Sequence, residues 1–291
     1  MKLLLENWRK YLNEGTQDRR MQMLKLAAIL HRFKMGGSQN IFDETYTAPI
    51  VGGAFHLARL PLLGFSDEEV SQLNQDLRAV RSTAVQERWT SYEGPAGRLK
   101  ELTTQYNLPP KVEISPEDAR VFAALVQKAP LHLDQPLYRG LHLPGISKND
   151  FAEAVHAAGQ GSKVRLAELI RKSVRPLSKE EDRFSSFSAD ADTASNFGGG
   201  GVGTVIARDG GKHYVPLPGV VLVLENPKFG LVLQEGSGEQ EVLVPYWSFA
   251  EPLEQHIKIE SDFVPKGTES FYEKSKEDET HYRFVMVGVT Q

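Results

Sequence analysis

Two glutamates one residue apart, Glu239 and Glu241, lie in the stretch EQEVLVP, which otherwise has the composition of a buried strand. Successive side chains on a strand point to opposite faces, so both carboxylates would share one face, about 7 Å apart. Like charges this close repel, so a cationic ligand would relieve the pair. The alternative is a solvated face at the edge of a sheet. The preceding loop carries two glycines and Glu235, which favours a substrate-facing loop.

A second polar cluster is RFSSFSADADTASNF, in which a strand rich in serine runs into a helix capped by Asp190 or Asp192. Ser186 and Ser188 share one strand face, as the two glutamates do. A serine hydroxyl at this position can hydrogen-bond a carboxylate and hold it in one rotamer. The alternative is a polar turn that does no more than start a helix.

The third segment is LYRGLHLPG, where Arg139 stands inside an apolar strand and Gly140 follows it. An arginine in this position forms an ion pair or extends its head group to solvent. The functional alternative is a guanidinium that grips phosphates, with Gly140 allowing a ligand to approach the backbone closely.

Taken in this order, Arg, Ser-x-Ser and Glu-x-Glu, the three segments resemble the mono-ADP-ribosyltransferase family, in the branch shared by arginine-modifying bacterial toxins and phage enzymes. The matching residues are Tyr138-Arg139-Gly140, then Phe184, Ser186-Phe187-Ser188, Ala194 and Phe197, and finally EQEVLVP at 239–245. Phe187 departs from the pattern, since the family has threonine there. The resemblance covers the chain from about Leu131 to Gln291.

The resemblance implies a reaction that breaks the N-glycosidic bond of NAD and transfers ADP-ribose to arginine. It implies that Glu241 binds the ribose 2′-hydroxyl and stabilises the ribosyl cation, that Ser186 orients Glu241, and that Glu239 receives the guanidinium of the target. It further implies an NAD-binding set of Arg139 for the phosphates, Gly140 for the nicotinamide amide, and Ser186, Ser188 and Phe197. NAD is the substrate, and no metal is expected.

Other motifs give weaker predictions. Gly198, Gly200 and Gly203 satisfy G-x-G-x-x-G, but a strand rather than a helix is expected after them, which argues against a dinucleotide fingerprint. The eight histidines have no close ligand spacing, and the absence of cysteine excludes disulfides and thiolate chemistry. A glycoside hydrolase could use paired carboxylates, but two on one strand face do not flank a cleft.

Composition indicates an ordinary globular chain. It has 291 residues, 40% hydrophobic and 25% charged, with a formal charge of −4 and both signs mixed. This balance argues against a broad basic face, so no direct nucleic-acid binding is expected. No apolar run reaches the roughly 18 residues of a membrane span, so no membrane partner is expected either.

The spacing of apolar residues predicts an α+β protein with a helical N-terminal region, and the resemblance implies an ADP-ribosyltransferase-like mixed β-sandwich core. Residues 15–130 are mainly helical, with helix starts at Ser66 and Ser115. Residues 131–291 are mainly β and form the expected catalytic domain; their short β-branched and aromatic runs are LYRGLHL, TVIA, VVLVLE, EVLVP, HIKIE and HYRFVMVGV. Two helical segments, FAEAVHAAG and VRLAELIRK, interrupt the strands.

Residues 1–14, MKLLLENWRKYLNE, resemble propeptides of proteins packaged in the heads of tailed bacteriophages, with cleavage after Leu12-Asn13-Glu14. The alternative is an amphipathic helix packed on the domain. The phage resemblance implies a virion head location and then the host cytoplasm, with a host protein bearing an exposed arginine as partner, for example in the transcription or translation machinery. The remaining alternatives are an NAD glycohydrolase and a non-catalytic head protein with a decayed transferase fold.

Overall fold

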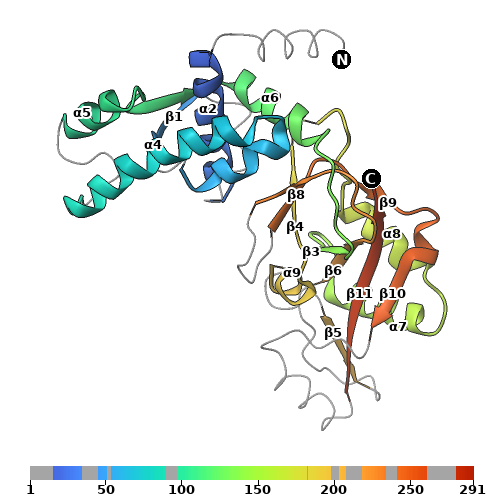
Figure 1. Ribbon diagram of the computed structural model, residues 1–291. Coiled ribbons are helices and arrows are strands. Elements are labelled where there is room, and N and C mark those ends of the chain that lie inside the picture. The colour runs from blue at the N-terminus through green and yellow to red at the C-terminus, as the bar shows by residue number, and fades with distance from the viewer. Residues whose placement is uncertain are drawn as a thin grey trace. The chain divides into compact units, whose positions relative to one another are not determined.

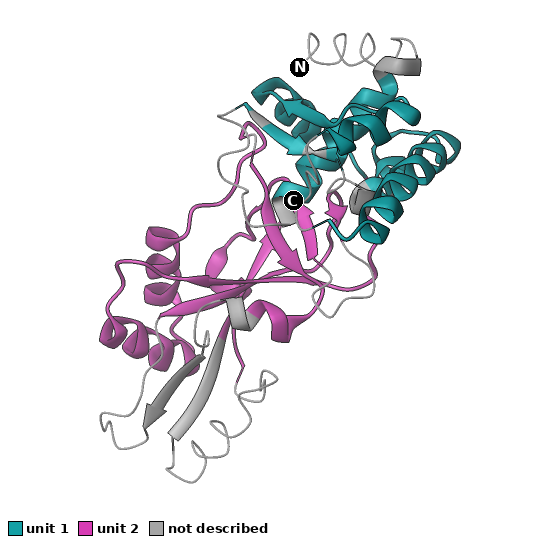
Figure 2. Cartoon of the chain, turned by 90° about the vertical axis from the view of Figure 1, so that its left-hand side faces the viewer, with its two compact units in different colours: residues 1–129 teal, residues 130–291 magenta. Residues whose placement is uncertain are grey.

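The chain divides into two compact units, residues 1–129 and residues 130–291 (Figures 1 and 2). The computed structural model describes residues 16–34, 45–50, 54–89, 97–181, 183–197, 203–207, 218–233, 241–260 and 280–291. The boundary expected at 130/131 lies beside this division. The expected propeptide, 1–14, lies outside the described residues.

The first unit is built mainly from helices. They are α2 (Thr16–Lys34), the 3₁₀ helix η1 (Ala54–Leu63), α4 (Asp67–Gln86), α5 (Arg98–Gln105) and α6 (Pro116–Val126). Both predicted helix starts are confirmed, because Ser66 and Ser115 each form a reciprocal capping box with the acidic residue three positions later. These caps satisfy amide groups that a helix leaves free at its start.

The first unit also contains a two-stranded sheet that the helical pattern did not predict. Strand β1 (Tyr46–Pro49) pairs antiparallel with β2 (Lys111–Ile114), which lies more than sixty positions further along the chain. Each strand has only four residues, too few for a periodicity of two to stand out from the helices around it. Residues Lys111–Ile114 alternate between charged and apolar, and the structure gives them the matching exposed and buried pattern.

The second unit contains a nine-stranded mixed sheet. Its strands are β3 (Leu137–His142), β4 (Ser185–Ser188), β5 (Gly203–Ala207), β6 (Gly219–Leu224), β7 (Leu231–Val232), β8 (Glu241–Val244), β9 (Ser248–Phe249), β10 (Ile257–Glu260) and β11 (Thr280–Thr290). The order is β10-β11-β6-β3-β4-β8-β7, with β5 and β9 also paired to β11. The β6–β11 pair is parallel and the other pairs are antiparallel.

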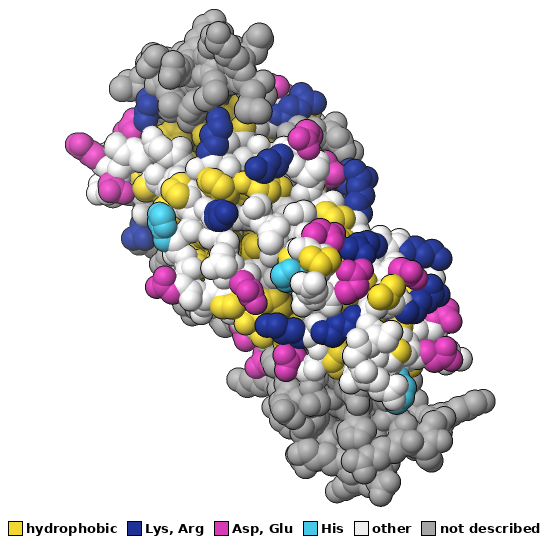
Figure 3. All heavy atoms as spheres, turned by 90° about the vertical axis from the view of Figure 1, so that its right-hand side faces the viewer, with side chains coloured by type: hydrophobic (Ala, Val, Ile, Leu, Met, Phe, Trp, Pro, Cys, Tyr) yellow, Lys and Arg dark blue, Asp and Glu magenta, His cyan; other side chains and the backbone are white. Residues whose placement is uncertain are grey.

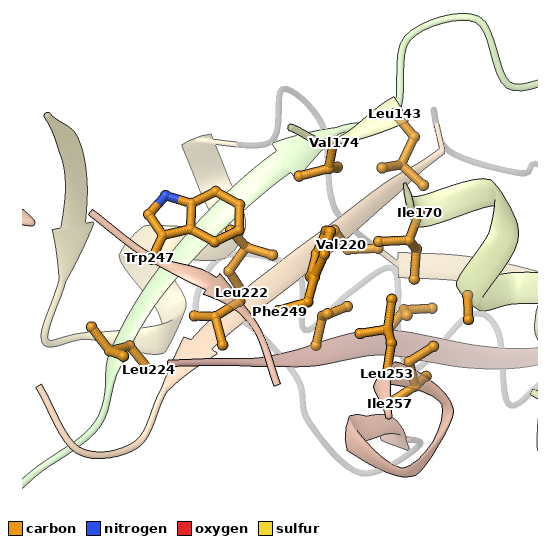
Figure 4. Close-up of a cluster of buried hydrophobic side chains, with 14 of the residues drawn as sticks. Leu143, Ile170, Val174, Val220, Leu222, Leu224, Trp247, Phe249, Leu253 and Ile257 are labelled. Carbon is orange, nitrogen blue, oxygen red and sulfur yellow. The ribbon is translucent and has the colours of Figure 1, made fainter. Parts of the chain in front are cut away.

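One hydrophobic core covers one face of this sheet (Figure 4). Helices α7 (Lys148–Gly159) and α8 (Val164–Ser173) contribute buried apolar side chains to it, among them Phe151 and Ile170. Trp247 and Phe249 meet edge to face in the same cluster, with ring centroids 5.8 Å apart. The remaining helices are the short α9 (Ala191–Phe197) and the 3₁₀ helix η2 (Leu253–His256).

The predicted α+β class is confirmed, and each of the six predicted runs forms a strand. The two interrupting helices are confirmed as α7 and α8. The strands of the expected sandwich are joined by hydrogen bonds into one connected sheet, because β11 is long enough to pair with four other strands. Strands β7 and β9 have two residues each and left no pattern in the sequence.

The mixture of charge signs in the sequence is also visible on the surface. Figure 3 shows acidic and basic side chains interspersed on the face that it displays. In the described part of the chain, no helix combines the length and the apolar character needed to cross a bilayer.

Candidate functional site

The central contact of the candidate site joins the serine strand to the glutamate strand. Ser186 on β4 donates its hydroxyl hydrogen to Glu241 Oε1 over 2.5 Å, although the two residues are 55 positions apart. Strands β4 and β8 pair antiparallel, with Ser188 opposite Glu241 and Ser186 opposite Leu243, so the hydroxyl reaches the carboxylate diagonally. The half-buried carboxylate of Glu241 is therefore held in one orientation by a neutral group.

Arg139 meets the same serine through its main chain. Its Nη1 donates to the carbonyl oxygen of Ser186 over 2.6 Å. Among the described residues, β3 and β4 pair only at Tyr138 and Ser188. The Ser186 carbonyl lies beyond this pair, and the Arg139 guanidinium takes the place of a backbone donor from β3. Burial lowers the pKa of Arg139, and the negative charge of Glu241 opposes that shift. The guanidinium still stays protonated, because arginine does not titrate in proteins.

The other two serines of this strand anchor it at each end. The buried hydroxyl of Ser185 accepts a hydrogen bond from the indole Nε1 of Trp247 at 3.0 Å. At the other end, Ser188 Oγ accepts from the amide of Asp190 at 3.0 Å. The Asp190 carboxylate then accepts from the amides of residues 192 and 193, which starts α9. Of the two predicted caps, Asp190 is the one that acts.

Strand register places Glu241 in a row of residues that crosses the sheet. Glu241 lies opposite Ser188, which lies opposite Tyr138. Tyr138 lies opposite Val223 on β6, and Val223 lies beside Gly288 on β11. Directly paired residues point to the same face of a sheet. This face is the one opposite the core, since the alternate residues of these strands lie in the core cluster.

Of the remaining predicted site residues, the structure describes the surroundings of Gly140 but not those of Phe197 or Glu239. Gly140 is buried on β3, opposite Val221, and helix α9 contacts both β3 and β4. Helix α9 ends at Phe197, whose side chain lies outside the described part. Glu239 also lies outside it, so its predicted position on the face of Glu241 stays a prediction. Searching the described residues for clusters of metal-binding side chains finds none.

Sequence reasoning missed the two residues that hold the serine strand in place. Ser185 and Trp247 are both buried and hydrogen-bond each other. Alternation gave a signal for Ser185, because it shares a strand face with Phe187, which points into the core. A hydroxyl on that face needs a partner, and a buried tryptophan N–H is a suitable donor.

The arrangement supplies a negative charge, Glu241, whose orientation is fixed by a hydrogen bond from the neutral Ser186 hydroxyl. Such a carboxylate can stabilise a cation that develops beside it. Because the carboxylate is already oriented, no free energy is spent on reorganising it during the reaction. Arg139 is half-buried and pairs with the core residue Leu222, so strand register starts its side chain from the face opposite Glu241. Its guanidinium donates to the Ser186 carbonyl oxygen, and its positive charge interacts electrostatically with Glu241.

Comparison of the chain with protein-family models, with curated protein sequences and with solved structures gives no match.

Proposed function

We propose that the second unit is an NAD-dependent mono-ADP-ribosyltransferase that transfers ADP-ribose to arginine side chains of proteins and releases nicotinamide. The observation that carries the proposal is the hydrogen bond from Ser186 to Glu241. The motif resemblance assigns Ser186 to the orientation of Glu241, and the two residues are brought together by strand pairing across 55 positions.

The chemistry follows from the position of the carboxylate. As the bond between ribose C1′ and the nicotinamide nitrogen breaks, its electron pair goes to nicotinamide, which leaves neutral. The positive charge then spreads over C1′ and the ring oxygen. Glu241, which accepts a hydrogen bond from the 2′-hydroxyl, stabilises this charge. A guanidinium nitrogen of the acceptor attacks C1′ and loses a proton. Glu239 aligns that guanidinium by accepting two parallel hydrogen bonds.

Arg139 contributes to binding in this scheme rather than to bond cleavage. Its guanidinium has donors beyond the one that Ser186 accepts, and these would bind the NAD pyrophosphate. An anion beside Arg139 would also offset the burial that lowers the pKa of this group. Gly140, Ser188 and Phe197 complete the proposed binding set.

Nicotinamide release and transfer to agmatine, a small guanidine compound, test the proposal. Purified protein incubated with NAD should release nicotinamide and form ADP-ribosyl-agmatine, both measured by chromatography with mass detection. Nicotinamide release without the agmatine product would instead indicate an NAD glycohydrolase. Release of neither product would favour the non-catalytic head protein or the glycoside hydrolase.

We further propose that the protein is packaged in a phage head and acts on a host protein after injection. The support is the similarity of residues 1–14 to head propeptides, with Glu14 before the cut. Protein from mature particles should then begin at Gly15, whereas recombinant protein made without the phage protease should keep Met1. Terminal sequencing decides, and an intact Met1 in mature particles would leave the amphipathic-helix alternative.

A further inference from the structure

A cavity of about 670 Å³ opens over the same sheet face as Glu241, within the second unit. Its floor includes Tyr138, Val223 and Gly288, which are members of the row that ends at Glu241. Because neighbouring strands are about 4.8 Å apart, Tyr138 is about 10 Å from Glu241 across β4. Ala191, the first residue of α9, also lines the cavity, so the cavity adjoins the candidate site.

The charges around this cavity balance. Lys228 and Lys258 lie on its rim together with Glu225 and Glu260. The Lys258 ammonium is 3.6 Å from the Glu225 carboxylate, and both side chains are more than 60% exposed, so this pair contributes little to stability. A pocket for the pyrophosphate of a nucleotide would have an excess of cations, whereas the lysines and glutamates among the described residues of this lining are equal in number.

The distribution of polar and apolar groups instead suits a polypeptide. Val223 and Met286, on the inner strands β6 and β11, are apolar members of the lining, whereas Lys258 and Glu260 lie on the edge strand β10. A desolvated apolar centre inside a polar rim is the usual organisation of a protein–protein interface. Rims of mixed charge select partners by complementarity and speed their association.

We propose that this cavity binds the polypeptide segment that flanks the acceptor arginine, as an extended chain with an apolar side chain on the floor and acidic and basic side chains at the rim. The inference rests on the transferase activity proposed above and defines its acceptor class. A segment seated over Tyr138 would bring an arginine about three residues away to the ribose carbon held beside Glu241, because an extended chain covers about 10 Å in three residues.

Two synthetic peptides with one central arginine test this inference. The first has flanks of valine, lysine and glutamate, and the second has flanks of glycine and serine. The protein should modify the first peptide with a kcat/KM about tenfold higher than the second. The double variant Lys258→Glu with Glu260→Lys should lose this preference, while Lys258→Arg should keep it. The kcat/KM for agmatine, which has no flanking segment, should change by less than about twofold in these variants.

Three results would overturn the inference: equal use of both peptides by the unmodified protein, an equal loss with agmatine in the double variant, or a raised KM for NAD in that variant. Anisotropy of the fluorescein-labelled peptides, measured without NAD, separates the inference from the proposed function. Preferential binding of the first peptide by a protein that releases no nicotinamide would contradict the transferase but leave a peptide groove. Activity on agmatine without any peptide preference would contradict only the groove.

Discussion

Two carboxylates of the first unit, Glu69 and Asp118, are held in a different way from Glu241 of the second unit. In the first unit, Glu69 accepts two hydrogen bonds from Arg19, at 2.6 and 2.9 Å. Asp118 in the same unit accepts two from the ammonium of Lys25, both at 3.0 Å. In the second unit, Glu241 accepts from a neutral serine hydroxyl and forms no ion pair with a described residue.

This difference separates a structural carboxylate from one available to a ligand. Asp118 joins α2 to α6 and caps α6, so its charge is fully used within the fold. Glu241 is oriented but not neutralised, and its negative charge remains available to a cationic group that enters the site. The contrast predicts that changes in the first unit alter stability, whereas changes at Glu241 alter activity.

The largest expected effect comes from Glu241→Gln, which keeps the shape of the side chain and removes its charge. Nicotinamide release should fall at least about 100-fold, while the free energy of unfolding stays within about 1 kcal/mol of the original. Asp118→Asn should do the reverse and cost about 1–3 kcal/mol of stability with little loss of rate. Urea unfolding and nicotinamide release measure the two effects, and near-normal NAD cleavage by Glu241→Gln would remove this residue from the site.

Glu239→Gln should separate the two substrates. A neutral amide cannot accept two hydrogen bonds from a guanidinium, so labelling of agmatine should fall about 100-fold, while slow NAD hydrolysis and NAD affinity stay largely intact. Nicotinamide release and agmatine labelling are measured side by side with Glu241→Gln, which should lower both. If a folded Glu239→Gln lost hydrolysis as completely, the proposed division of labour between the glutamates would be wrong.

Ser186→Ala should have a smaller effect on rate. It removes the donor that orients Glu241, and a hydrogen bond to a charged group contributes about 1.5–3 kcal/mol, so kcat should fall about tenfold or more. Ser188→Ala is the matched comparison, because Ser188 bonds the Asp190 amide at the start of α9 and should affect stability more than rate. Equal loss of kcat in both variants would contradict the distinct roles of these serines.

The smallest effect concerns the pH dependence of the first unit. The hydrogen bond from Arg19 is the main cause that lowers the pKa of Glu69 below 4.5, and the Ser66 capping box adds to it. The stabilisation is therefore complete well above pH 4.5 and is lost as the pH falls through the lowered pKa. Glu69→Gln should cost about 1 kcal/mol at pH 7 and less at pH 3, because pH 3 lies below the ordinary pKa of 4.5. A cost that does not change between these pH values would show that the charge of Glu69 contributes nothing.

Local patterns in the sequence determined helix starts in the first unit and most strands of the second. Ser66 and Ser115 mark helix starts because a capping box needs only residues within four positions of each other. The runs that became β3, β6 and β11 are β-branched and apolar, which fits a buried strand whatever its partner. The motifs around Arg139, Ser186 and Glu241 gave the candidate chemistry by their residue types and order.

Only the tertiary structure decided which of these residues meet. Strand pairing connects segments far apart in the chain, so no local pattern could show that Ser186 bonds Glu241 or that the Arg139 guanidinium meets a carbonyl. The hydrogen bond from Trp247 to Ser185 joins residues 62 positions apart. The cavity depends on register in the same way, because its floor combines residues from β3, β6 and β11 that share one sheet face. A one-residue shift in any of those pairings would turn the row that ends at Glu241 toward the core.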